Sequence, residues 1–241
     1  MKTFNQELKS ALLAEIIKHR EQDRVVQGTY GEKGEENFRG CAVGCSIHSL
    51  FIITGRHYRP YNHEAYETEL GIPRILGELQ DVIHEGLSDA DFPTWPERFM
   101  AAVPIETDLS LVFPKFALWL LSDEVYGVLH KAKTDEEREI ISSAIDLCHR
   151  TIADGEAIPG SVWFDLGNAA NALVTNKRRA PRATMYLCFA LNPGVVDRRR
   201  SVDYALLQHF YSSSIQEVEK HHKLCADKLI ELLIAEDKNG I

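Results

Sequence analysis

The sequence predicts an all-α protein, a bundle of about ten helices with little or no sheet. Apolar residues recur at helical spacing along most of the chain, and helix caps and helix stops separate the periodic segments. The alternation of apolar and polar residues that marks a half-buried strand is absent. The 241 residues contain no repeat, low-complexity tract or convincing linker, so we expect a single domain over residues 1–241.

The composition narrows the class of protein. Apolar residues make up 44% of the chain and charged residues 26%, as in an ordinary globular protein. No apolar run is long enough to span a bilayer, and the N-terminus has no apolar signal-peptide core. Five cysteines without framework spacing indicate free thiols in a reducing cytoplasm. The net charge of −9 gives the protein a negative overall electrostatic field, which disfavours binding to nucleic acids or membranes.

In the first half of the chain, five segments have the apolar spacing of helices or are bounded by residues that begin or end helices. Residues 41–54 contain β-branched residues that also permit a strand, but Gly55 is a natural helix stop. Residues 28–40 contain four glycines and a cluster of charges, and they are predicted to form a loop. The expected helices span residues 4–20, 41–54, 63–70, 73–84 and 93–103.

In the second half, capping residues define most of the expected boundaries. Thr134 and the glutamate three residues after it form a capping box for a helix that Gly155 ends. Asp108 or Ser110 is expected to cap the helix before it, and Ser122 is expected to begin another. The remaining expected helices span residues 159–175, 181–191 and 201–235.

The main candidate site lies in the stretch from Gly28 to Gly55. On a helix, Cys41, Cys45 and His48 fall on one face, and thiolate and imidazole are ligands that zinc prefers. These three residues are therefore candidate metal ligands, although their spacing is not a standard zinc motif and a fourth ligand is missing nearby. The alternative is that both cysteines are buried and pack the core.

Cys41 is also the candidate catalytic residue, as a nucleophile. It lies at the expected start of a helix, where the helix dipole and unpaired N–H groups favour a thiolate. His48 lies about two turns away, which is too far for it to act as the base. The base would come from elsewhere in the chain, and the candidates are His57, His63, His84 and His222.

Two D-x-x-H pairs, Asp81/His84 and Asp146/His149, would align a carboxylate with an imidazole on a helix. A metal site of that type needs its ligands to face a bundle core. The neighbouring residues on each helix face are mostly polar, so we interpret both pairs as parts of solvated faces.

Basic residues are concentrated near the end of the chain. Seven of the 27 lysines and arginines lie within the 24 positions from Lys177 to Arg200. The planar guanidinium group suits phosphate and carboxylate, so we expect an acidic or phosphate-bearing partner here. The alternative is a set of solvated loops or surface salt bridges. The candidate partner-binding residues are Arg178, Arg179, Arg198 and Arg199.

Two functions from different classes therefore remain open. The first is a helical binding or regulatory protein that holds its partner at the arginine-rich loops or in an apolar groove. The second is an enzyme or metal protein centred on Cys41, Cys45 and His48. The first is favoured slightly, because the second lacks an identified base and a fourth metal ligand. The sequence identifies no cofactor, indicates no membrane partner and leaves a homo-oligomer open.

Overall fold

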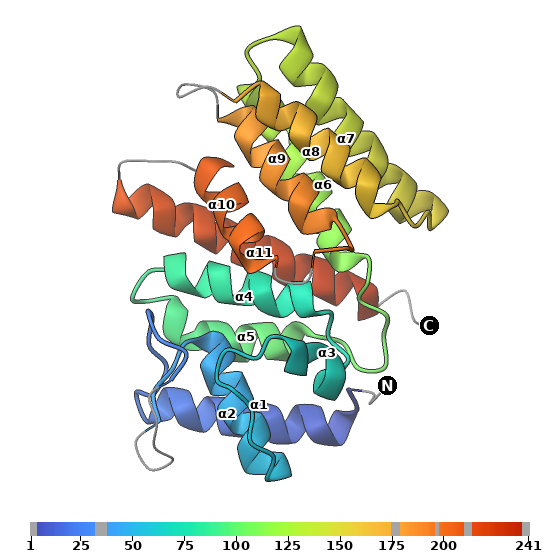
Figure 1. The fold of residues 1–241 in the computed structure, drawn as a ribbon. Coiled ribbons are helices and arrows are strands. Elements are labelled where there is room, and N and C mark those ends of the chain that lie inside the picture. The colour runs from blue at the N-terminus through green and yellow to red at the C-terminus, as the bar shows by residue number, and fades with distance from the viewer. Residues whose placement is uncertain (1–3, 32–37, 175–178, 196–197, 210–213, 238–241) are drawn as a thin grey trace. The chain divides into compact units, whose positions relative to one another are not determined.

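The structure is a computed structural model that describes residues 4–31, 38–174, 179–195, 198–209 and 214–237. These residues form eleven α-helices and two short 3-10 helices, with no strand among them (Figure 1). Their one extended pairing is an isolated parallel bridge between Val25 and Gly40. The predicted all-α class is therefore confirmed.

The chain divides into two compact units, residues 1–109 with 214–241, and residues 110–213. The prediction of a single domain stays a prediction. The first unit contains α1 (Gln6–Glu21), α2 (Ala42–Thr54), α3 (Glu64–Leu70), α4 (Arg74–Gly86), the 3-10 helix η1 (Phe92–Thr94), α5 (Trp95–Ala102) and α11 (Ile215–Asp237). The second contains α6 (Val112–Ser122), the 3-10 helix η2 (Val128–Lys131), α7 (Asp135–Asp154), α8 (Gly160–Ala172), α9 (Ala180–Leu191) and α10 (Arg199–His209).

Several helices begin or end at a residue whose side chain or backbone conformation satisfies the free backbone groups of the helix end. The Thr134 hydroxyl accepts a hydrogen bond from Glu137 N, so the predicted cap of α7 is confirmed. Gly55 and Gly155 end α2 and α7 with positive φ values of 69° and 64°, a conformation that glycine adopts at little steric cost. These stops are also as predicted.

The predicted boundaries around α6 are wrong. Neither Asp108 nor Ser110 caps this helix, whose N-cap is Leu111 without a side-chain hydrogen bond. Ser122 ends α6 and begins no α-helix. Asp123 Oδ1 accepts hydrogen bonds from the backbone N–H groups of Val125 and Tyr126, and such local bonds favour a turn over a new helix.

The long helix predicted over residues 201–235 is also wrong, because the structure has two helices there. α10 ends at His209 and α11 begins at Ile215. Residues 212–214 are three consecutive serines. Serine competes for backbone hydrogen bonds and favours helix starts over helix interiors, so this run was a usable signal for a break.

Within the first unit, α4 is covered on more than one side. It packs against α2, α3, α5 and α11, and Figure 1 shows it alongside α11 on one side and α5 on the other. Its apolar residues, such as Leu76, Leu79 and Ile83, are completely buried. Four of its polar residues are completely buried as well, and these are Glu78, Gln80, Asp81 and His84. This buried polar face of α4 is where the candidate site lies.

Candidate functional site

The segment before α2 brings the backbone of Tyr30 against the first turn of that helix. Cys41 N donates to Thr29 O at 2.7 Å, and Val26 N and Gly40 O form a hydrogen bond of 2.9 Å. A Cβ added at Gly44 would lie only 1.9 Å from Tyr30 O. Glycine at position 44 is thus required for the close approach that places Tyr30 and Cys41 together.

Cys41 is the N-cap residue of α2 and is buried. Its thiol donates a hydrogen bond of 3.4 Å to Oδ1 of Asp81. Asp81 comes from the middle of α4, so the contact joins two elements that are 40 residues apart in the sequence.

Asp81 has no exposed surface, and protein donors hold its second oxygen. Tyr30 OH donates to Oδ2 at 2.7 Å, and His63 Nε2 lies 3.3 Å from the same atom. Because a carboxylate only accepts, the His63 contact is a hydrogen bond when Nε2 carries the proton. His63 is the N-cap residue of α3 and is also buried. Three segments of the chain therefore orient one carboxylate.

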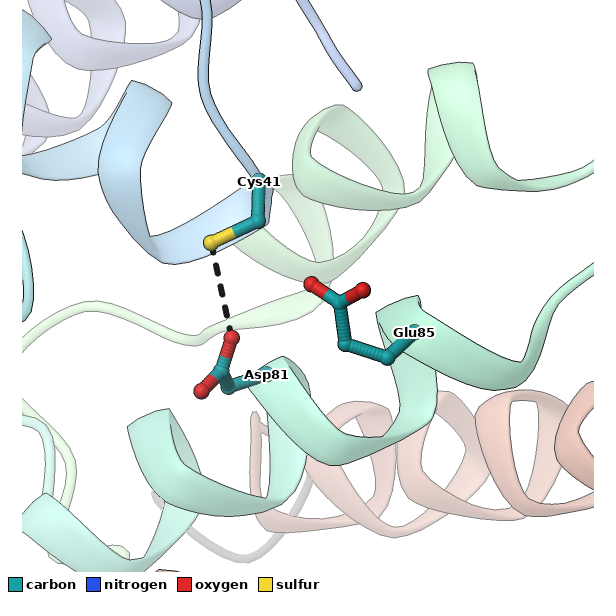
Figure 2. A group of neighbouring side chains, drawn as sticks. All are labelled: Cys41, Asp81 and Glu85. Atoms are coloured by element: carbon teal, nitrogen blue, oxygen red, sulfur yellow. Dashed lines mark hydrogen bonds between the residues drawn. The ribbon is translucent and has the colours of Figure 1, made fainter. Parts of the chain in front are cut away.

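Glu85 lies one helical turn after Asp81 and is half-buried. Its Oε2 accepts a hydrogen bond of 2.7 Å from Gly28 N. One donor atom each from Cys41, Asp81 and Glu85 all lie within 4.8 Å of one another. Figure 2 shows the Glu85 carboxylate turned toward the space beside Cys41 and Asp81. We call these three residues the Cys41–Asp81–Glu85 cluster.

The surroundings of Cys41 oppose a thiolate. Burial raises the pKa of the Cys41 thiol well above its usual range, and the negative charges of Asp81 and Glu85 raise it further. The position at the helix N-terminus does not offset these effects. The thiol is thus protonated at neutral pH unless a cation joins the cluster, which weakens the case for a free thiolate nucleophile.

The structure does not bring the side chains of Cys41, Cys45 and His48 to one point. The Cys45 thiol donates to Gly40 O at 3.3 Å, and burial raises its pKa to about 12. His48 Nδ1 instead lies 2.9 Å from Nε2 of His19 on α1. In the part of the chain that the structure describes, the Cys41–Asp81–Glu85 cluster is the one group of three or more such residues close enough to share a metal ion.

Of the four candidate base histidines, His63 contacts a member of the cluster, because its Nε2 lies 3.3 Å from Asp81 Oδ2. His57 stacks on Phe51 with ring centroids 4.4 Å apart. His84 Nε2 lies 3.0 Å from Val26 O, and His222 Nδ1 lies 2.9 Å from Val218 O. His63 contacts Asp81 rather than Cys41, so the arrangement is not a nucleophile–base pair.

Sequence reasoning missed Asp81 and Glu85. The interpretation of Asp81/His84 as a solvated face is wrong, since neither residue has any exposed surface. The same interpretation is confirmed for Asp146/His149, which are both exposed. One sequence signal was available for the cluster: Asp81 and Glu85 are four residues apart, which aligns two carboxylates on one helix face.

The arginine-rich segments differ in how much of them the structure describes. Arg178 lies outside the described residues. Arg179, Arg198 and Arg199 are half-buried, and Arg200 is exposed. Whether they bind a partner stays a prediction.

No family model, curated protein or solved structure matches this chain. Among the helices that the structure describes, none is long and apolar enough to cross a membrane.

Proposed function

We propose that this protein binds a divalent metal ion of the zinc class through Cys41, Asp81 and Glu85. The observation that supports this most is the convergence of a thiol and two carboxylates within 4.8 Å, from the start of α2 and from α4. Zinc binds cysteine sulfur and carboxylate oxygen alike, so the donor set suits it. The proposal replaces Cys45 and His48 with the two carboxylates as partners of Cys41.

The charges in the cluster also support a cation. Two carboxylates and a thiol lie together, and two of the three residues are buried. A divalent ion would offset the repulsion between the carboxylates and displace the thiol proton, because a coordinating thiol is deprotonated.

The contacts behind the cluster match those that orient metal ligands. Asp81 Oδ2 is held by Tyr30 and His63, and Glu85 Oε2 is held by Gly28 N. Such contacts fix the direction of ligating carboxylates and increase metal affinity. Three protein ligands leave one tetrahedral position, which water or substrate fills in catalytic zinc sites. There the ion would act as a Lewis acid or would activate a bound water.

Metal content and cobalt spectroscopy test this function. The purified protein is expected to retain about one zinc per chain after desalting, and the cobalt-loaded protein is expected to show thiolate-to-cobalt charge-transfer absorption. Cys41→Ser should abolish this absorption, and Asp81→Asn should lower the metal content.

Cys45→Ser is the matched control, because Cys45 is an equally buried thiol one turn away on the same helix. It should keep both the zinc and the absorption. Loss of the metal in Cys45→Ser and His48→Asn, but not in Asp81→Asn, would instead support the ligand set Cys41, Cys45 and His48. A wild-type protein that retains neither zinc nor cobalt would contradict both sets.

The cysteines also support a proposed location. All five are free and buried. An odd number of unpaired thiols suits a reducing compartment, so we propose that the protein works in the cytoplasm. Secretion of the natural protein into an oxidising medium would contradict this.

A further inference from the structure

One stretch of this acidic protein has a positive net charge. Residues 173–213 contain seven basic and two acidic residues, a net charge of +5, whereas the whole chain has −9. This stretch includes α9 and α10, which pack closely against each other. At physiological salt, charges more than about 8 Å apart at the surface are largely screened. Charges close to these two helices therefore affect a ligand there more than the distant acidic residues do.

Both helices present an arginine and an aromatic ring at helical spacing. On α9, Arg182 and Tyr186 are half-buried while most of their neighbours are buried. On α10, Arg200 is exposed, and Tyr204 one turn later is 43% exposed. Neither Arg182 nor Arg200 makes an ion pair with any residue that the structure describes. Each guanidinium is thus available about one turn from an accessible ring.

Four aromatic rings extend across three helices. Tyr186 on α9 stacks on Tyr204 of α10 with ring centroids 5.0 Å apart. Phe189, three residues after Tyr186, lies 6.1 Å from Phe164 of α8, which is 51% exposed. Residues three apart are neighbours on a helix surface, so the two ring pairs are adjacent. We call the six residues the aromatic–arginine face, and they are Phe164, Arg182, Tyr186, Phe189, Arg200 and Tyr204.

We propose that the aromatic–arginine face binds single-stranded nucleic acid. Bases stack on aromatic side chains with little regard to sequence, and arginines contact the backbone phosphates. An acidic peptide would pair with the arginines but would leave the exposed parts of Phe164 and Tyr204 uncovered. A duplex keeps its bases stacked on one another, out of reach of a flat surface. A single strand contacts both the rings and the arginines. This binding does not depend on the proposed metal site.

Fluorescence anisotropy with a short labelled oligothymidylate tests the proposal. Saturable binding is expected, with an affinity that falls as salt increases. Tyr204→Leu and Phe164→Leu keep an apolar side chain but remove the flat ring, and each should weaken binding roughly ten-fold if one base stacks there. Arg182→Gln and Arg200→Gln should weaken binding and reduce its salt dependence.

The matched controls lie in the same unit but outside the face. Val125→Ala removes an apolar side chain that is 75% exposed, and Lys133→Gln removes an exposed cation. Both should leave binding unchanged, and thermal melting should show that all variants fold. Absence of binding, tighter binding to duplex than to single strand, or equal effects of controls and face variants would overturn the proposal. Binding of polyglutamate in preference to the oligonucleotide would assign the face to an acidic protein instead.

Discussion

The D-x-x-H pairs of α4 and α7 have the same spacing and opposite environments. Asp81 and His84 on α4 have no exposed surface, whereas Asp146 and His149 on α7 are exposed. Asp81 makes hydrogen bonds to three side chains from other segments. The motif alone therefore does not decide whether a carboxylate is solvated or belongs to a site.

The difference comes from what packs on the polar side of each helix, opposite its buried apolar side. On α7, the buried residues Ala144, Leu147 and Cys148 face the core, and the other side meets solvent. On α4, the apolar side is buried, and the polar side is covered by the start of α2, by α3 and by Tyr30. A buried polar face needs partners for its polar groups, and these partners form the candidate site.

The largest difference is expected between Asp81→Ala and Asp146→Ala. Asp81→Ala should lower the free energy of unfolding by about 3 kcal/mol or more, because it leaves Tyr30 and His63 without their shared acceptor in a buried site. Asp146→Ala, at an exposed position, should change it by less than about 0.5 kcal/mol. Urea unfolding measures both. Similar losses at the two positions would mean that α7 is also covered in solution.

A second comparison uses two glycines. Gly44→Ala should cost about 3 kcal/mol, since its Cβ would lie 1.9 Å from Tyr30 O. Gly155→Ala should cost about 1 kcal/mol, because its φ of 64° strains alanine but no atom lies within 4 Å of the new Cβ. A larger loss of thermal stability in Gly155→Ala than in Gly44→Ala would contradict the close approach of Tyr30 to α2.

The lowered pKa values of His48 and His84 predict acid sensitivity. Burial lowers the pKa of His48 from 6.5 to about 4, and it also lowers the pKa of His84. The unfolded chain then binds protons that the folded protein does not, so stability should decrease as the pH falls from about 6.5 toward 4. His84→Gln should make urea unfolding less dependent on pH over this interval, whereas His149→Gln should preserve the dependence. An equal effect of the two variants would contradict the difference in burial.

The smallest expected effect is that of the α7 cap. Thr134→Ala should destabilise the protein by about 1 kcal/mol, because the free N–H of Glu137 loses its acceptor. Thr134→Ser keeps the hydroxyl and should retain most of the stability. α4 has no side-chain cap at Pro73, so its stability depends on packing. Equal stability of the wild type and Thr134→Ala in urea would show that the cap does not stabilise the protein.

The helical class and many of the helix ends follow from the sequence alone. Thr134, Gly55 and Gly155 act on groups within a few residues, and the apolar spacing acts within one helix, so both can be read without tertiary structure. The sequence also placed Cys41 at the start of α2, where this residue is the N-cap. These predictions hold because their causes are local.

The groups that surround Cys41 follow from tertiary contacts and not from the local sequence. Asp81 lies 40 residues away in the sequence. Its polar neighbours on α4 are typical of a solvated face, but in the structure α2, α3 and Tyr30 cover this face. The ring pairs Tyr186–Tyr204 and Phe164–Phe189 likewise join separate helices. A periodic pattern tells which side of a helix is polar, but it does not tell which other segment packs on that side, because that depends on contacts distant in the sequence.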